Sequence, residues 1–282
     1  MTVSPLPRYL VTEMVTRALA EDQGGRGDIT AIACIPARTN TKFYIRSRGT
    51  GVVCGMEPAA EAFWQMDPDA SFSEQVRDGD RIEPGDILAT VHGNARALLS
   101  AERIALNFLG RMSGVASFTR QYVDAVAGTG VKIAHTRKTT PGLRPFELQA
   151  VEAGGGSRHR YGLDDAILIK DNHVAVCGGV DAAVSAARTY AGHMTRVAVE
   201  VDRLDQLPEA IDAGAESVLL DNFSLEDLRK AVAAARGRVI LEASGGVTLD
   251  TVRPIAETGV DVISIGALTH SAPNFDIGLD DA

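Results

Sequence analysis

Six short apolar runs recur through the second half of the chain, about 20 to 35 residues apart. They are rich in β-branched residues and read VKIAH (131–135), AILIK (166–170), VAVEV (197–201), SVLLD (217–221), RVILE (238–242) and DVISIG (261–266). Helical patterns over 179–191, 204–215 and 225–236 separate several of these runs. Apolar strands that are joined by helices predict a parallel sheet buried on both faces.

The polar residue that ends each run helps to choose between two parallel architectures. A doubly wound sheet concentrates its functional groups near one switch point, whereas a barrel places them at the carboxyl ends of many strands. Here nearly every run ends on an ionisable residue. The six end residues are His135, Lys170, Glu200, Asp221, Glu242 and Gly266. The pattern therefore predicts an α/β barrel.

The first hundred residues follow a different pattern. Apolar residues at helical spacing predict a helix over 8–21, and shorter helical patterns cover 57–66. Strand-like runs occupy 42–48 and 51–55, and turn residues with alternating apolar positions predict a small β region over 76–93. A longer helix is predicted over 97–127, with a break near Ser113 and Gly114. Together these elements predict a mixed α/β domain that precedes the barrel.

Net charge narrows the range of partners. The 282 residues carry a formal net charge of -9, whereas nucleic acids and anionic membranes require a basic face, so we expect neither as a partner. No apolar run approaches the roughly 20 residues that cross a bilayer, and no secretory signal is recognisable at the start. The three cysteines are far apart and form no CxxC. We therefore expect a cytoplasmic protein.

Positive charge is concentrated at the first two predicted strand ends, despite the acidic balance of the chain. The stretch HTRKTTPGLR (135–144) supplies Arg137 and Lys138, the loop GGGSRHRYG (154–162) supplies His159 and Arg160, and Lys170 ends the next run. A solvated basic loop would explain any one of these cations. On a barrel, however, these cations would converge at one mouth. There the guanidinium groups of arginine and the ammonium groups of lysine would bind carboxylate or phosphate.

Two carboxylates and two small-residue segments complete the predicted mouth. Glu200 and Asp221 end strongly apolar strands, so they need partners, which could be lysines, a magnesium ion or sugar hydroxyls. Glu242 is open to a catalytic or a structural interpretation. The segments EASGGV (242–247) and SIGALTH (264–270) follow the last two strands, where barrels commonly bind phosphate. The residues predicted for this phosphate seat are Ser244, Gly245, Gly246, Ile265, Gly266 and Ala267.

The motifs together resemble one family. HTRKTTPGLR, HRYGLDDAILIKDNH (159–173), EVD (200–202), LLDNF (219–223), EASGGV and IGALTHS (265–271) are similar to the quinolinate phosphoribosyltransferases, also called carboxylating nicotinate-nucleotide pyrophosphorylases. The similarity extends to ALAEDQGGRGDIT (18–30) and LLSAERIALNFLGRMSGVAS (98–117). Gly110 is a departure, because the family leads us to expect a larger polar residue there.

The resemblance implies a type II phosphoribosyltransferase fold: an N-terminal α/β sandwich domain (1–112), an incomplete parallel α/β barrel (113–268) and a tail (269–282) that packs back on the N-terminal domain. It also implies a reaction between quinolinate and phosphoribosyl pyrophosphate with Mg²⁺, which gives nicotinate mononucleotide, pyrophosphate and CO₂ on the de novo route to NAD. The implied assembly is a homodimer, or a hexamer built as a trimer of dimers, with shared active sites.

The same resemblance implies roles for individual residues. Lys138, Lys170, Glu200 and Asp221 are the expected catalytic residues, and the two carboxylates are also the expected Mg²⁺ ligands. Arg103 is expected to reach the partner subunit's site. The substrate contacts implied by the family are Arg103, Thr136, Arg137, Lys138, His159, Arg160, Lys170, Glu200 and Asp221, together with the six residues of the phosphate seat.

Three alternatives keep a similar barrel. A paralogue found in molybdenum transport operons shares the lysine–arginine stretch, but we expect it to lack an intact HRYGLDDAILIKDNH. Nicotinate phosphoribosyltransferase acts on a monocarboxylate, for which two basic clusters are excessive. A non-catalytic sugar-phosphate-binding barrel would explain the phosphate seat but not the four cations Arg137, Lys138, Arg160 and Lys170.

Overall fold

The structure is a computed structural model that describes residues 3–282. The chain forms two compact units, and both are discontinuous in sequence. Unit 1 contains Met1–Arg120, Thr140–Gly155 and Ser271–Ala282, and unit 2 contains Gln121–Thr139 and Gly156–His270. Within the described range, no helix is both long enough and apolar enough to cross a bilayer.

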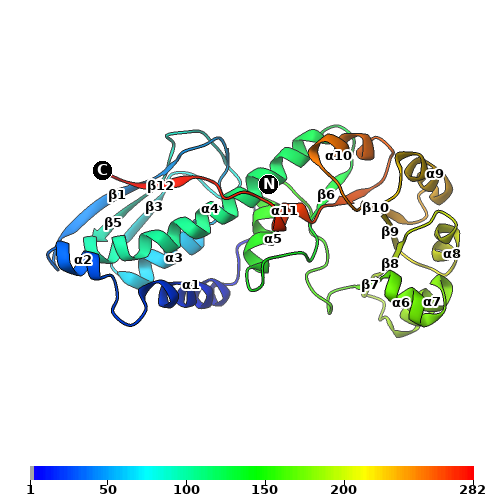
Figure 1. Cartoon of the computed structure of the whole chain (residues 1–282), viewed down its shortest axis with the longest axis horizontal. Coiled ribbons are helices and arrows are strands. Elements are labelled where there is room, and N and C mark those ends of the chain that lie inside the picture. Colours follow the sequence, from blue (N-terminus) through cyan, green and yellow to red (C-terminus); the bar gives the residue numbers. More distant parts are fainter. Residues whose placement is uncertain (1–2) are drawn as a thin grey trace. The chain divides into compact units, whose positions relative to one another are not determined.

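Unit 1 is built on a four-stranded antiparallel sheet with the order β12-β1-β5-β3 (Figure 1). The last strand of the chain pairs with the first, so that Ile45 lies opposite Leu279. Ile45, Ala89 and Val91 are fully buried, and Ile45 lies opposite Ala89 in the ladder, so these residues form the core face of the sheet. A short ribbon of β2 and β4 lies outside this sheet. The bounds are β1 Asn40–Ser47, β2 Gly51–Val52, β3 Ser71–Glu74, β4 Arg81–Ile82, β5 Ile87–Asn94 and β12 Ile277–Asp281.

Two helices of unit 1 begin where a carboxylate accepts hydrogen bonds from the backbone. Asp28 accepts a hydrogen bond from the Ala31 N–H at the start of α2, and Asp78 accepts from the Gly55 and Met56 N–H groups at the start of α3. Such side-chain acceptors satisfy N–H groups that have no partner within the helix. The bounds are α1 Arg8–Gln23, α2 Ile29–Cys34, α3 Met56–Met66, α4 Ala95–Ala125 and α5 Arg144–Ala153.

Helix α4 is continuous, so the predicted break near Ser113 and Gly114 is wrong. The glycine has a packing role instead. A Cβ at Gly114 would collide with the carbonyl group of Pro273, and one at Gly110 would lie 3.0 Å from the Phe275 carbonyl oxygen. The Phe275 N–H also donates to the Gly110 carbonyl at 2.8 Å. Both glycines therefore let the segment before β12 approach the helix backbone closely.

Unit 2 contains the six-stranded parallel sheet that the apolar runs predict. Its order is β6-β11-β10-β9-β8-β7. Within the described residues the ladder ends at β6 and β7, and one isolated bridge joins Ala134 to Ser157, so the barrel is incomplete as predicted. The strands are β6 Lys132–Ala134, β7 Ile167–Ile169, β8 Val197–Val201, β9 Ser217–Asp221, β10 Ile240–Ser244 and β11 Val262–Ser264.

Most helices of unit 2 lie along the outer face of its sheet (Figure 1). In β8, Val197, Val199 and Val201 are buried, whereas Ala198 and Glu200 on the other face are partly accessible. That alternation places the accessible residues on the inner face of the open barrel. The bounds are α6 Asp171–Cys177, α7 Val180–Tyr190, α8 Gln206–Asp212, α9 Leu225–Ala235, α10 Leu249–Ala256 and α11 Ala267–His270.

Candidate functional site

A cavity of about 380 Å³ lies at the carboxyl ends of the unit 2 strands. Its lining is drawn from all six strands or from the residues that follow them. The lining residues are Thr136, Arg137, Lys138, His159, Arg160, Leu168, Lys170, Glu200, Leu219, Asp221, Glu242, Ser244 and Ser264. The parallel sheet thus brings together side chains that are far apart in the sequence.

Two arginines form a crowded cationic side of this cavity. Burial, and then the nearby charge of Arg137, lower the pKa of the Arg160 guanidinium from its usual value. Arginine begins so high that it stays charged. The Nε atoms of Arg137 and Arg160 are buried without a hydrogen-bond partner in the described structure. Two half-buried cations with unused donors favour the binding of an anion.

Lysine and glutamate face each other across two neighbouring strands. The Lys170 Nζ lies 2.9 Å from the Glu200 Oε2, and the Glu200 side chain is 15% exposed while that of Lys170 is 47% exposed. Lys138 is exposed, and its backbone N–H donates to the Thr136 Oγ1 at 3.2 Å. Lys170 is therefore held by its partner, whereas Lys138 forms no ion pair among the described residues.

A residue that the sequence prediction missed positions the second carboxylate. The Asn222 Nδ2 donates to the Asp221 Oδ2 at 2.8 Å, and the Asn222 backbone N–H donates to the Ser244 carbonyl at 2.9 Å. Asn222 adopts the left-handed conformation with φ 57°, which asparagine tolerates better than most residues. The next loop needs glycine, because Gly245 has φ 97° and a Cβ there would collide with the Asn222 side chain. The Asp-Asn pair in LLDNF is the sequence signal for this arrangement.

The five other residues of the predicted phosphate seat lie just beyond the cavity lining. Gly245 and Gly246 follow β10 and are exposed, and Gly266 and Ala267 begin the turn into α11. A Cβ at Gly266 would lie 2.9 Å from the Lys138 Cδ, so glycine there gives the lysine stem its room. The Ile265 N–H donates to the Ala134 carbonyl at 2.9 Å and is already engaged in the sheet.

Glu242 and Ser264 are lining residues with unused polar atoms. Glu242 lies in the middle of β10, and Ser244 ends that strand, so the prediction that Glu242 ends a strand is wrong. The Glu242 Oε1 and the Ser264 Oγ are buried and have no hydrogen-bond partner in the described part of the chain. Ser264 was missed by the sequence prediction. Orphaned polar atoms from four lining residues mark this cavity as a ligand site.

The donors present suit a metal that is held mainly by its ligand. Among residues 3–282, no group of three or more His, Cys, Asp or Glu side chains is arranged to hold a metal ion. Glu200 and Asp221 are two carboxylates in one cavity. Magnesium commonly binds one or two carboxylates together with substrate phosphates and waters. The site fits that pattern and does not fit an all-protein metal cage.

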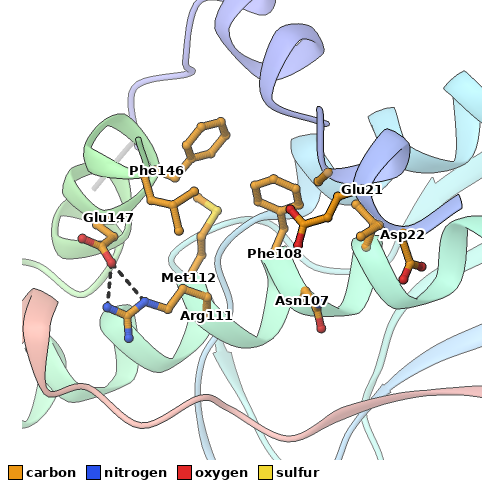
Figure 2. Close-up of a pocket in the computed structure, with 11 residues that line it drawn as sticks. Glu21, Asp22, Asn107, Phe108, Arg111, Met112, Phe146 and Glu147 are labelled. Atoms are coloured by element: carbon orange, nitrogen blue, oxygen red, sulfur yellow. Dashed lines mark hydrogen bonds and ion pairs between the residues drawn. The ribbon is translucent and has the colours of Figure 1, made fainter. Parts of the chain in front are cut away.

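Unit 1 has its own cavity, of about 350 Å³, between α1, α4 and α5. In Figure 2, Arg111 and Glu147 form an ion pair on one side of this cavity, and Glu21 and Asp22 lie on the other side. The Glu147 Oε1 accepts from the Arg111 Nε at 3.1 Å and from Nη2 at 2.6 Å. Arg103 lies nearby on α4, exposed, and is not among the lining residues of either cavity.

The chain matches two protein-family models. The model described as the C-terminal domain of quinolinate phosphoribosyl transferase matches residues 115–280. The model described as the N-terminal domain matches residues 28–113.

Similar proteins from bacteria cover nearly the whole chain. A nicotinate-nucleotide pyrophosphorylase (carboxylating) of Mycobacterium leprae is 43% identical, over 95% of this chain and 96% of that protein. A probable nicotinate-nucleotide pyrophosphorylase (carboxylating) of Bacillus subtilis is 41% identical, over 91% of this chain and 88% of that protein. The solved structure of the nicotinate-nucleotide pyrophosphorylase from Francisella tularensis superimposes with a TM-score of 0.95 at 38% identity, and it covers 100% of this chain and 99% of that one.

Proposed function

Because the chain belongs to the quinolinate phosphoribosyltransferase family, we propose that it transfers the phosphoribosyl group of phosphoribosyl pyrophosphate to quinolinate. Pyrophosphate and CO₂ leave, and the product is nicotinate mononucleotide, an intermediate of de novo NAD synthesis. The observation that carries the proposal for this cavity is its set of cations with unused donors facing two carboxylates. The cations suit a dicarboxylate, and the carboxylates suit the hydroxyls of a phosphorylated sugar.

Arg137 and Arg160 bind the two carboxylates of quinolinate. Guanidinium groups bind carboxylates through paired N–H donors, and both arginines have a buried Nε without a partner among the described residues. Lys138 extends past Gly266 toward the side of the cavity that would take the pyrophosphate. The 5′-phosphate binds the loops after β10 and β11, where Gly245, Gly246 and Gly266 leave the backbone accessible.

Glu200 and Asp221 act on the ribose. As pyrophosphate leaves, the ribosyl carbon gains positive charge, and fixed carboxylates stabilise such charge while they orient the ribose hydroxyls. Lys170 holds Glu200 in place at 2.9 Å, and Asn222 holds Asp221. When Mg²⁺ is bound, it neutralises charge on the pyrophosphate, and Glu200 and Asp221 are the residues that would hold it.

Decarboxylation follows from the first step. Attack by the pyridine nitrogen makes the ring cationic, so the ring stabilises the electron pair left when the bond to the 2-carboxylate breaks. CO₂ leaves, and the ring carbon takes a proton. The protein forms no further bond in this step. Arg137 and Arg160 contribute by orienting the quinolinate.

We propose further that two subunits share each site. Arg103 is exposed on α4 and, within the described residues, forms no ion pair, so its charge is available to another chain. A two-fold dimer would make the exchange reciprocal, each subunit supplying its arginine to the other.

Product analysis tests the reaction. The protein is incubated with phosphoribosyl pyrophosphate, Mg²⁺ and either quinolinate or nicotinate, and nicotinate mononucleotide and CO₂ are quantified. We expect product and one equivalent of CO₂ from quinolinate, and little turnover of nicotinate. Turnover of nicotinate alone would identify a monocarboxylate transferase. Ligand binding without any turnover would favour a non-catalytic sugar-phosphate-binding barrel.

A further inference from the structure

Two consecutive backbone N–H groups in the loop before β7 donate to histidine rings. The His159 N–H donates to the Nε2 of His135 at 3.0 Å, and the Arg160 N–H donates to the Nδ1 of His159 at 2.8 Å. His135 is 1% exposed and directly follows β6. The backbone that presents Arg160 is thus attached to the barrel through two imidazoles.

These hydrogen bonds indicate which nitrogen of the His159 ring donates. Since its Nδ1 accepts a hydrogen bond, the ring proton is on Nε2. The His159 Nε2 lies 3.3 Å from the Glu242 Oε2, so its N–H points at a carboxylate. The ring is therefore held at both nitrogens. In this arrangement the ring N–H of His159 is directed at the Glu242 carboxylate.

Packing alone does not hold this ring in place. His159, Arg160, Leu168 and Glu242 line the cavity at the carboxyl ends of the strands and also a second cavity of about 530 Å³. The second cavity lies toward the amino ends, where its lining includes the first residues of β6, β9, β10 and β11. The four shared residues form a partition with empty space on both sides. Side chains between two cavities have fewer packing neighbours than side chains in a close-packed core, so polar contacts contribute more to their position.

We propose that Glu242 is a positioning residue that acts through His159 on Arg160, and so sets the affinity for the dicarboxylate substrate. Glu242 is 6% exposed and rises from the middle of β10, which makes it a rigid anchor. It holds the His159 ring, whose Nδ1 holds the Arg160 backbone. The guanidinium of Arg160 is fixed separately, because its Nη1 donates to the Ala166 carbonyl at 3.1 Å. The proposal rests on the proposed function for the identity of the substrate.

Steady-state kinetics of two Glu242 variants test this role. Glu242→Gln keeps an oxygen that accepts from the His159 Nε2–H, whereas Glu242→Ala removes it. We expect Glu242→Ala to raise KM for quinolinate about tenfold, which corresponds to about 1.4 kcal/mol, with KM for phosphoribosyl pyrophosphate and kcat changed less than about twofold. Glu242→Gln should raise KM for quinolinate clearly less than Glu242→Ala does. Equal losses in both variants would show that the negative charge itself is used, and would overturn the proposal.

A double-mutant cycle shows whether the effect passes through His159. Glu242→Ala is combined with His159→Ala, and KM for quinolinate is measured for the wild type, both single variants and the double variant. If Glu242 acts through His159, the substitution Glu242→Ala should change KM very little in a protein that already lacks the His159 ring. The two losses should therefore not add. Additive losses would mean that Glu242 acts on the substrate or the fold by another route, and would sink the proposal.

NMR of ring-labelled histidine gives a readout that does not depend on turnover. The His159 Nε2–H signal, assigned with the His159→Ala variant, should be slow to exchange with solvent in the wild type and in Glu242→Gln, and fast in Glu242→Ala. The same exchange rate in all three would contradict the anchoring hydrogen bond. A wild-type protein that is inactive on quinolinate but shows the expected exchange pattern would overturn the proposed function and leave the anchor intact.

Discussion

Unit 1 and unit 2 each contain a cavity of comparable size, about 350 Å³ and about 380 Å³. Both place arginine near glutamate. In unit 1, Arg111 is bound by Glu147 through two nitrogens (Figure 2). It donates through a third nitrogen to the Ala272 carbonyl at 3.0 Å. Glu147 also accepts from the Thr140 N–H and hydroxyl. The polar groups of that cluster satisfy one another.

The unit 2 cavity differs in having polar groups that the chain leaves unsatisfied. Arg137, Arg160, Glu242 and Ser264 each retain a buried atom without a partner in the described structure. Leaving such an atom unpaired costs about 1 to 3 kcal/mol, so a ligand that supplies the missing partners would bind favourably here. Volume does not separate the two cavities. The two cavities differ in whether their buried polar atoms have hydrogen-bond partners, and this difference indicates that the unit 2 cavity binds a charged ligand.

Removal of a cation from the unit 2 cavity is the strongest test of this difference. We expect Lys138→Ala and Lys170→Ala to fold normally but to lose at least about 100-fold in kcat/KM. Lys138→Ala leaves substrate charge without its electrostatic partner, and Lys170→Ala removes the ammonium group that holds Glu200. Circular dichroism and steady-state kinetics measure the two properties. Lys230→Ala is the matched control, since Lys230 is exposed on α9 and, within the described residues, forms ion pairs only with Glu226 and Asp227. Near-normal turnover in both site variants would show that these cations belong to a solvated loop and do not bind substrate.

Complementation tests whether unit 1 contributes to the charged site of a partner. Arg103→Ala and Lys138→Ala are each expected to be nearly inactive. When the two are unfolded together and refolded as mixed dimers, each mixed dimer should contain one site with both residues intact, so about half of a mixed dimer's normal activity should return. Native mass spectrometry confirms that mixed dimers form. Inactive mixed dimers would show that Arg103 does not act across the subunit boundary.

Disruption of the satisfied cluster in unit 1 should affect stability rather than chemistry. Glu147→Ala leaves Arg111 and the Thr140 groups without their acceptor, and removal of one partner of a buried pair costs about 3 kcal/mol. We expect a clearly lower midpoint of denaturation, measured by urea titration with circular dichroism. Glu147→Gln, which keeps an acceptor oxygen, should lose less. Unchanged stability in Glu147→Ala would mean that the cluster contributes nothing to the fold.

The smallest expected effect concerns Asp78, a unit 1 carboxylate that has its hydrogen bonds but is buried. Burial raises the pKa of Asp78, against the hydrogen bonds from Met56 and Gly55 that lower it. A raised pKa in the folded state means that this group's contribution to stability is complete below the ordinary aspartate pKa of about 3.9 and is lost as pH rises through the raised value.

Asp78→Asn should therefore raise Tm slightly at neutral pH, by about 2 °C. It should also flatten the fall in Tm that accompanies rising pH through the acid range, because asparagine keeps an acceptor for the α3 cap and carries no charge. Thermal denaturation from pH 4 to pH 8 measures both effects. A lower Tm across the whole range would show that the cap needs the charged carboxylate.

The sequence was most informative where periodicity reflects local structure. The six parallel strands, the helices between them and the convergence of Lys138, Lys170, Glu200 and Asp221 follow from apolar runs and their polar ends. The features that it did not predict depend on contacts distant in sequence. Gly114 does not interrupt α4 because the segment at Pro273 packs against it. The segment Thr140–Gly155 lies between two barrel strands in the sequence but belongs to unit 1.

Site residues divide in the same way. Ionisable side chains at strand ends were predictable because their type and position are both visible in the sequence. Asn222 and Ser264 were missed because their importance comes from a left-handed backbone and from an unfilled hydrogen bond, and neither has a periodic signal. Glu242 could not be assigned, since only the fold shows that it faces His159.

The pairing of β12 with β1 has a consequence for synthesis on the ribosome. Arg48, next to β1, and its ion-pair partner Asp280 in β12 are 232 residues apart. At about 5 to 20 residues per second, β1 waits about 10 to 50 seconds for this neighbour. During that interval one edge of β1 is exposed and can pair with other chains. The nascent protein is therefore most vulnerable to aggregation before its last strand emerges, and a chaperone that shields this edge would raise the yield.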